Sequence, residues 1–336
     1  MENGTNSRSA SLAGSSLPPS PHNGTTIPAS TPTAAASTPR VDVPPVGNIT
    51  TNDGVTLHYE RFGSHGPVVC LIHGWSGSRH YWDLNTRIIA RTCQVITYDL
   101  RHHGESDKPA VGFHVARLAA DLHNLLRGLN LENVTVVGAS MGAAIIWSYF
   151  ELFAGDRISQ AVFVDQAPLQ NIAIDWKAGS TGCYDTASLT RLQCRLLTDF
   201  KGFAKDNALF CAGPGIAPDA MKVLENETLR ANPVALAALM ADHTALDWRP
   251  VLQQIKIPCI NIIGRRSAVF PWWGVEEVGR LVPGCKNFFF EEENHWMYLQ
   301  QPSKFSALVA AFATDGTVGA EKAWTHLHPS ISEIVH

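Results

Sequence analysis

A serine between two glycines has the setting in this sequence that most directly suggests chemistry. Residues 138–142 read Gly-Ala-Ser-Met-Gly, which fits the pattern G-x-S-x-G. They follow the β-branched run 134–137 and precede an apolar run, residues 143–153, that is typical of a helix. The glycines permit a sharp turn in which larger side chains would clash. The pattern predicts that Ser140 is exposed at the end of a strand as a nucleophile.

Serine is a weak nucleophile at neutral pH, so this chemistry also needs a base and N–H donors. Ser140 has to lose a proton as it attacks a carbonyl carbon, and we expect the base among the 14 histidines. The negative charge that develops on the substrate oxygen needs donors already in place. The backbone N–H of Met141 is one candidate, because it follows the serine at a predicted helix N-terminus.

The elements that must position these residues alternate between buried strands and helices. Asp53-Gly54 forms the turn of a predicted hairpin over residues 48–62. Apolar runs typical of buried strands follow at residues 68–72, 94–98, 134–137, 158–164, 259–263 and 287–290. Helical periodicity separates them, as at residues 115–129. This alternation predicts an α/β fold with a doubly wound, mostly parallel sheet.

The order of these patterns divides the chain into five parts, residues 1–45, 46–168, 169–245, 246–313 and 314–336. The first part is rich in Ser, Thr, Pro, Ala and Gly, which predicts a disordered segment. The second and fourth parts form the core of the fold. The third carries short helical patterns and no clear strand, which predicts an inserted helical cap. The last is a polar, loose tail in which residues 320–327 could form a short helix.

Composition argues against several other functions. The formal net charge of -4 and the lack of a long basic run argue against nucleic acid as a partner. No apolar stretch reaches the length of about 18 residues that indicates a transmembrane helix. The seven cysteines show no C-x-x-C spacing, so we expect a reducing, cytoplasmic setting and no metal site. No G-x-G-x-x-G or phosphate-binding loop occurs, and we expect no cofactor.

Four features, in this order, resemble the α/β-hydrolase superfamily. They are His73-Gly74 after the third strand, the loop at 99–106, the G-x-S-x-G turn, and Asn294-His295-Trp296 after the last strand. The resemblance covers residues 46–313. The position and composition of the expected cap are similar to the branch that holds epoxide hydrolases, haloalkane dehalogenases, cofactor-free haloperoxidases and small-molecule esterases. Some fungal secondary-metabolite hydrolases are also similar.

The resemblance implies roles for residues on both sides of Ser140. His295 would be the general base, because the family orders its serine before its histidine. The family takes a second oxyanion donor from the loop after the third strand, where Trp75 follows the His-Gly pair. The backbone N–H groups of Trp75 and Met141 would together hold the oxyanion.

The acid that would orient the histidine is not at the family's usual place. That place follows the strand at 259–263, where this sequence has Ser267. Some members carry the acid at the end of the strand after the nucleophile helix, and this sequence has Asp165 there. We therefore expect Asp165 to complete a triad with Ser140 and His295. A dyad without an acid stays open, as do two weaker candidates, Asp242 and Asp247.

The expected reaction is hydrolysis of a carboxylic ester, lactone or thioester of a small hydrophobic molecule through an acyl-enzyme. Serine as the nucleophile argues against dehalogenases and epoxide hydrolases of this fold, which use aspartate to open bonds at saturated carbon. We expect His243 to pack rather than to face the substrate. The same site could also serve an acyltransferase or a C–C bond hydrolase, or bind a ligand without catalysis. Aromatic residues predict an apolar pocket lined by Trp75, Trp176, Phe270 and Trp296.

Overall fold

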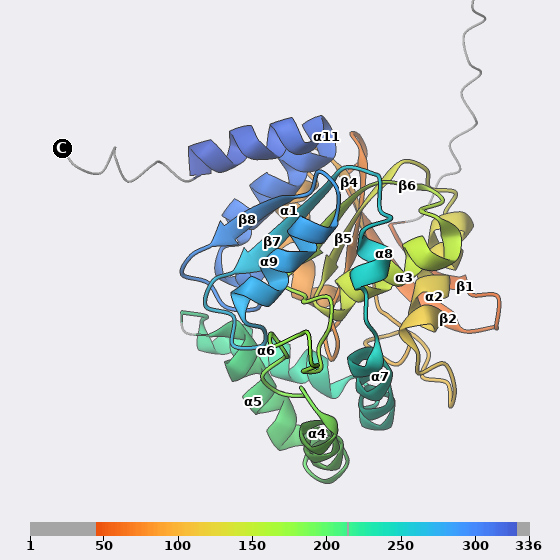
Figure 1. The fold of residues 1–336 in the computed structure, drawn as a ribbon. Helices are drawn as coiled ribbons and strands as arrows, with labels where there is room; N and C mark the ends of the chain where they lie inside the picture. The colour runs from red at the N-terminus through yellow and green to blue at the C-terminus, as the bar shows by residue number, and fades with distance from the viewer. Residues whose placement is uncertain (1–44, 214, 328–336) are drawn as a thin grey trace, which may run out of the picture. The chain divides into compact units, whose positions relative to one another are not determined.

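The computed structural model describes residues 45–213 and 215–327. The disorder expected for residues 1–45 therefore lies outside the described residues, apart from residue 45. An eight-stranded sheet runs through the described chain (Figure 1). Its strands are β1 (Val46–Thr50), β2 (Thr56–Phe62), β3 (Val68–Ile72), β4 (Gln94–Tyr98), β5 (Val134–Ala139), β6 (Ile158–Val164), β7 (Cys259–Gly264) and β8 (Lys286–Phe290).

The order of the strands across the sheet is β1-β2-β4-β3-β5-β6-β7-β8. β2 pairs antiparallel with β1 and β4, whereas each neighbouring pair from β4 to β8 is parallel. The register aligns Ile72 with Gly138, and Ala139 with Val164. The carboxyl ends of β3, β5 and β6 therefore meet at one edge, and the residues that follow them gather there. The predicted doubly wound, mostly parallel sheet is confirmed.

Helices cover both faces of the sheet (Figure 1). One face carries α2 (Val115–Gly128), α3 (Met141–Phe153), α8 (Arg249–Leu252) and α9 (Trp272–Leu281), and the other carries α1 (Asp83–Ile89) and α11 (Pro302–Leu327). Two short helices, η1 (Arg79–Trp82) and α10 (Met297–Gln300), border α1 and α11. Each face buries its own apolar core, and these cores hold β5 and the turn after it between two packed layers.

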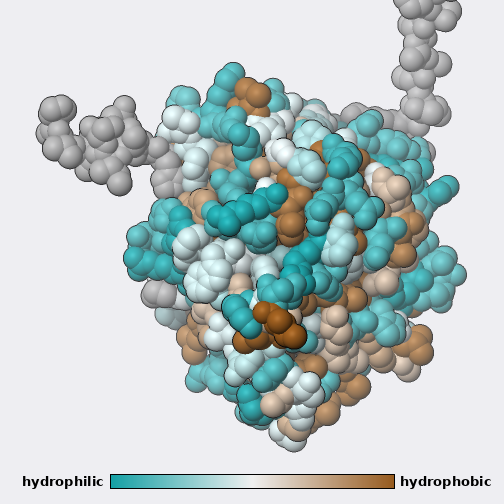
Figure 2. All heavy atoms as spheres, in the orientation of Figure 1, coloured by the Kyte–Doolittle hydropathy of each residue, from teal (hydrophilic) through white to brown (hydrophobic). Residues whose placement is uncertain are grey.

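Four further helices come between β6 and β7, and we call them the inserted helices: α4 (Thr186–Thr198), α5 (Phe200–Ala212), α6 (Pro218–Leu229) and α7 (Pro233–Ala245). They lie together in the lower part of Figure 1. Over this part of the face drawn in Figure 2, hydrophobic side chains project among hydrophilic ones. Trp75, after β3, donates its indole N–H to the carbonyl of Leu236 in α7 at 2.9 Å. This bond ties the inserted helices to the sheet.

The tail expected after residue 313 differs from the structure. α11 continues as far as Leu327, with a break in its helical backbone at Gly316. The packing of Trp324 explains this, because its ring lies against those of Phe288 and Phe290 in β8, and buried aromatic area stabilises the turns that carry it. Within the described ranges no helix, α11 included, has the length and apolar character needed to cross a membrane.

Candidate active site

Ser140 lies at a sharp turn between β5 and α3. Its backbone has φ 52° and ψ -124°, a combination that residues with a side chain rarely adopt. Its N–H donates to the carbonyl of Val164 at the end of β6, at 2.8 Å. A β-carbon on Gly138 would come within 2.3 Å of the carbonyl oxygen of Gly142, and one on Gly142 within 2.5 Å of that of Ile72. Close packing of strand and helix therefore requires both glycines.

Gly138→Ala is expected to lower the free energy of unfolding by about 2–3 kcal/mol, the upper part of the usual range for overpacking. The added methyl group would meet backbone atoms at the start of α3, which cannot move without moving the helix. Urea unfolding followed by circular dichroism measures the effect. Gly128→Ala in α2 is the matched control, because its β-carbon would meet only Ile49, at 3.6 Å. A Gly138→Ala variant as stable as the wild type would contradict this account of the turn.

His295 and Asp165 are 130 positions apart in the chain and meet at the carboxyl edge of the sheet. His295 Nδ1 lies 2.7 Å from Asp165 Oδ2, and both side chains are buried. The second carboxylate oxygen, Oδ1, accepts the N–H of Gly264 at 3.0 Å. Ser267 donates its hydroxyl to Oδ2 at 2.6 Å. Ser267, at the family's usual acid position, thus supports Asp165. Hydrogen bonds with His295, Gly264 and Ser267 fix the carboxylate in place.

The two weaker acid candidates have other partners. Asp242 accepts the N–H of Val115 at the start of α2, at 2.8 Å. Asp247 forms an ion pair with Arg249 at 2.6 Å. Both carboxylates are therefore engaged in structural contacts, whereas Asp165 is the carboxylate that holds the histidine ring.

Asn294 organises the loop that carries His295, a role that the sequence did not reveal. Its Oδ1 accepts the N–H groups of His295 at 2.7 Å and of Ala268 at 2.6 Å. Its Nδ2 donates to the carbonyl of Phe210 in α5 at 2.8 Å. One side chain therefore ties the histidine loop to the loop after β7 and to an inserted helix. The sequence signal that could have found it is its place directly before the histidine.

Met141 and the loop that carries Trp75 both lie next to Ser140. Met141 is the first residue of α3, so its N–H has no acceptor within the helix. Trp75 follows Gly74, whose β-carbon, if it had one, would lie 3.1 Å from Cβ of Ser140. The loop after β3 therefore passes directly beside the serine, and Trp75 lines the same cavity as Ser140.

His73 holds this loop in place. The N–H of Leu100 donates to His73 Nε2 at 3.1 Å, so the ring proton is on Nδ1, which donates to the carbonyl of Gly74 at 2.8 Å. Burial lowers the pKa of the His73 imidazole, which favours the neutral ring that this pattern requires. The His-Gly pair of the motif thus serves the geometry of the loop.

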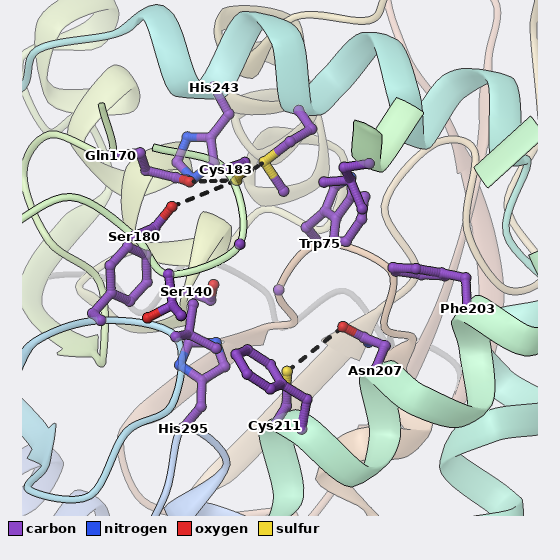
Figure 3. A pocket seen from close by; sticks show the side chains of 18 of the residues that line it. Trp75, Ser140, Gln170, Ser180, Cys183, Phe203, Asn207, Cys211, His243 and His295 are labelled. Atoms are coloured by element: carbon purple, nitrogen blue, oxygen red, sulfur yellow. Dashed lines mark hydrogen bonds between the residues drawn. The ribbon is translucent and has the colours of Figure 1, made fainter. Parts of the chain in front are cut away.

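A cavity of about 560 Å³ opens beside Ser140 and extends among the inserted helices. Three of the four pocket residues predicted from sequence, Trp75, Phe270 and Trp296, line it. Figure 3 shows Trp75 at the cavity with Ser140 and His295. Its volume is typical of a site for a small molecule. The predicted residues that follow four strands, β3, β5, β7 and β8, thus surround one space.

Trp176, the fourth predicted pocket residue, packs elsewhere, and that prediction is wrong. Its side chain is buried against α9, where the absence of a side chain at Gly274 leaves room for it. The Arg249 guanidinium carbon lies 5.8 Å from the centroid of its ring. The residue precedes the first inserted helix in an irregular segment, so no periodicity indicates which way its side chain faces.

His243, on α7, lines the cavity, although the sequence favoured a role in packing. The side chain is 2% exposed. Burial lowers the pKa of its imidazole to about 4, so the ring is neutral at pH 7. The structure therefore adds a neutral, buried histidine to the wall of the cavity, and this residue is separate from the pair formed by His295 and Asp165.

Together these groups can move a proton and stabilise a negative charge. With Asp165 at Nδ1, the ring of His295 presents Nε2 as the nitrogen that can take a proton from a hydroxyl. Ser140 supplies a hydroxyl at the same cavity. The backbone N–H of Met141, which has no acceptor within α3, is a donor next to this hydroxyl in the chain. The arrangement suits attack by a serine on a carbonyl carbon.

Residues 67–302 match the family described as alpha/beta hydrolase fold. The chain is 25% identical over 264 residues to the pimeloyl-[acyl-carrier protein] methyl ester esterase of Vibrio cholerae, covering 76% of this chain and 98% of that protein. It is similar to the solved bromoperoxidase from Bacillus anthracis, with TM-score 0.74, 25% identity, and coverage of 80% of this chain and 100% of that one. An esterase from Exiguobacterium antarcticum shares the fold, with TM-score 0.75, 23% identity, and coverage of 79% and 98%.

Proposed function

Because the chain belongs to the α/β-hydrolase fold family, we propose that it is a serine hydrolase that cleaves a carboxylic ester, lactone or thioester through an acyl-enzyme. The observation that carries this proposal is the contact of His295 with Asp165 at 2.7 Å, beside a cavity that Ser140 also lines. A histidine held in this way, next to a serine on a strand–helix turn, is equipped for acyl transfer. The relatives named as esterases support an ester-acting hydrolase.

In the first half of the proposed reaction, Ser140 Oγ bonds to the carbonyl carbon while His295 Nε2 takes its proton. The N–H groups of Met141 and Trp75 stabilise the oxyanion. Asp165 orients the ring and stabilises the imidazolium that forms. When the tetrahedral adduct collapses, the bond to the alcohol or thiol breaks, and His295 gives its proton to the departing atom. The acyl group is then an ester of the serine.

In the second half, His295 removes a proton from water as the water oxygen attacks the acyl carbonyl carbon. The bond to Ser140 breaks, its oxygen takes back the proton, and the carboxylic acid leaves. In a lactone, the alcohol and the acid are parts of one product. An alcohol or thiol in place of water would make the same site an acyltransferase, and product analysis with both acceptors present separates the two outcomes.

A small hydrophobic substrate is the one that this cavity suits best. The rings of Trp75 and Phe203 meet edge to face in its wall, with centroids 5.5 Å apart. Phe270 also lines the cavity, and its ring centroid lies 5.9 Å from that of His295. Aromatic walls of this kind bury apolar parts of a ligand, while a few polar groups orient it.

A fluorophosphonate probe is expected to label the folded protein once, at Ser140. The activated hydroxyl would displace fluoride from phosphorus, and the oxyanion donors would bind the phosphoryl oxygen. Mass spectrometry of the intact protein measures the added mass, and peptide mapping locates it. Heat-denatured protein is the control and should not react, because labelling needs the folded site. No labelling, together with no turnover of p-nitrophenyl esters from acetate to decanoate, would favour a non-catalytic ligand-binding protein instead.

A further inference from the structure

His243 belongs to a group of polar side chains in the cavity wall. It follows Met240 by one helical turn on α7, so the two side chains share a face of the helix. Cys183 Sγ lies 3.5 Å from Met240 Sδ and 3.4 Å from Gln170 Oε1. Figure 3 shows His243, Gln170 and Cys183 close together. We call these three residues the polar wall.

Neither ring nitrogen of His243 has a hydrogen-bond partner among the described residues. Two other buried histidines, His73 and His295, do have such partners. His73 Nδ1 lies 2.8 Å from a carbonyl oxygen, and His295 Nδ1 lies 2.7 Å from a carboxylate oxygen. Burying a polar group without a partner costs free energy, so such groups are rare in folded proteins. Because His243 lines a cavity, a bound molecule can supply the missing partner.

The chemistry of the His243 ring favours a hydroxyl as that partner. The ring is neutral at pH 7, since burial lowers its pKa to about 4. A neutral imidazole has one N–H donor and one bare nitrogen that accepts. A hydroxyl can accept from the first or donate to the second, so it suits either tautomer. A carbonyl or ether oxygen can only accept, and an ammonium group can only donate.

The rest of the cavity limits what can carry this hydroxyl. Trp75 and Phe203 form an aromatic wall that Figure 3 shows apart from the polar wall. Ser140 and His295 lie apart from His243 as well. A molecule that fills this space would hold its reacting carbonyl at Ser140, its apolar body against the rings, and a polar substituent at the polar wall.

We propose that His243 is a specificity-determining residue that hydrogen-bonds a hydroxyl group of the substrate, and that the substrates are hydroxylated esters, lactones or thioesters with an otherwise hydrophobic skeleton. The hydroxyl is remote from the bond that is cleaved, because His243 is separated from Ser140 and His295 in the cavity (Figure 3). This inference rests on the proposed function, since it names the substrate class of the same site.

The test compares the p-nitrophenyl ester of 3-phenylpropanoic acid with the esters of its 2-, 3- and 4-hydroxyphenyl analogues. The wild-type enzyme should hydrolyse at least one hydroxylated ester with a kcat/KM about 10-fold or more above that of the parent ester, because a buried polar group left unpaired disfavours the parent. Hydrolysis of all four esters with kcat/KM within about threefold would overturn the inference and leave the proposed function standing.

Substitutions of His243 assign the preference to this ring. In His243→Leu, which lacks both nitrogens, the ratio of kcat/KM for the preferred hydroxylated ester over the parent should fall to about one. His243→Gln keeps a donor and an acceptor and should restore part of the ratio. His326→Leu, at an exposed position of α11, is the control and should keep the wild-type ratio. A preference of full wild-type size in His243→Leu would overturn the inference. If the leucine variant does not fold, a preference of full wild-type size in His243→Gln would overturn it instead.

Binding to Ser140→Ala separates the two proposals. Calorimetry with the methyl esters of the same acids measures affinity without turnover. The preferred hydroxylated methyl ester should bind about 10-fold or more tightly than the parent methyl ester. If Ser140→Ala shows this difference in affinity but the wild-type protein hydrolyses none of the p-nitrophenyl esters, the role of His243 would be supported and the proposed function contradicted. Equal affinity for all four methyl esters would overturn the role of His243.

Discussion

Replacing Ser140 with alanine is expected to lower kcat for the best p-nitrophenyl ester by about 10⁵-fold. The serine oxygen is the atom that would bond to the substrate. Two other serines line the cavity, but the hydroxyl of Ser180 lies against Cys183 and that of Ser188 donates to Asp185. Cys183 and Cys211 also line the cavity, but burial raises the pKa of each thiol, which keeps both as poor nucleophiles at pH 7. The activity that remains would come from the oxyanion donors and substrate binding.

Steady-state and single-turnover kinetics of the Ser140→Ala variant measure this loss. Ser148→Ala is the matched control, because it removes a hydroxyl from α3, the helix that follows Ser140, at a buried position that does not line the cavity. Circular dichroism and the thermal unfolding midpoint establish that both variants are folded. Retention of more than about a tenth of the wild-type kcat in Ser140→Ala would exclude the serine as nucleophile, since a true nucleophile is worth several orders of magnitude.

The strand–turn–helix around Ser140 could be predicted because its constraints are local. A β-carbon at Gly138 or Gly142 would collide with backbone atoms, so this turn, packed as it is here, requires glycine at both positions. The strands were predictable for a similar reason, since β3 to β7 are almost continuously buried and therefore read as apolar runs. Both the glycines of the turn and the apolar runs of the strands can be recognised within a few consecutive residues.

The contact of His295 with Asp165 could be predicted only through the resemblance to a family. The two residues are 130 positions apart, and no local pattern indicates that they meet. The resemblance indicated the strand ends at which family members carry the acid, and the departure at Ser267 directed attention to the end of β6. The structure gives Ser267 a role that the sequence did not suggest, as a donor to the Asp165 carboxylate.

The sequence did not indicate which way side chains face within irregular or inserted segments. Trp176 and His243 were assigned the reverse of their observed positions. The position of Trp176 depends on how an irregular segment packs against α9, and that of His243 on how α7 packs over the cavity. For the tail the sequence suggested at most a short helix at residues 320–327, whereas α11 runs through it from Pro302 to Leu327. Its stability depends on the contact of Trp324 with Phe288 and Phe290, a tertiary interaction that outweighs the polar composition of the segment.

Asp165→Asn is expected to lower kcat by about 10³- to 10⁴-fold. The amide keeps an oxygen that can accept the N–H of Gly264, so the loop should retain its conformation. Its NH₂ group, however, would face His295 Nδ1 and favour the tautomer with the proton on Nε2, the nitrogen that must accept the proton of Ser140. Kinetics measure the loss. Asp242→Asn, which changes a cap of α2, is the matched control and should stay within about threefold of the wild type, the scale of a single surface hydrogen bond.

A second substitution can test whether the loss comes from the missing charge. Ser267 Oγ lies 2.6 Å from Asp165 Oδ2, which in turn lies 2.7 Å from His295 Nδ1, so a carboxylate at 267 can approach the same ring. The double variant Asp165→Asn, Ser267→Asp should regain about 10-fold or more of the kcat lost in Asp165→Asn. Ser267→Asp alone should be less stable than the wild type, because two carboxylates in contact repel each other. If the kcat of Asp165→Asn were as high as that of Asp242→Asn, Asp165 could not be the orienting acid.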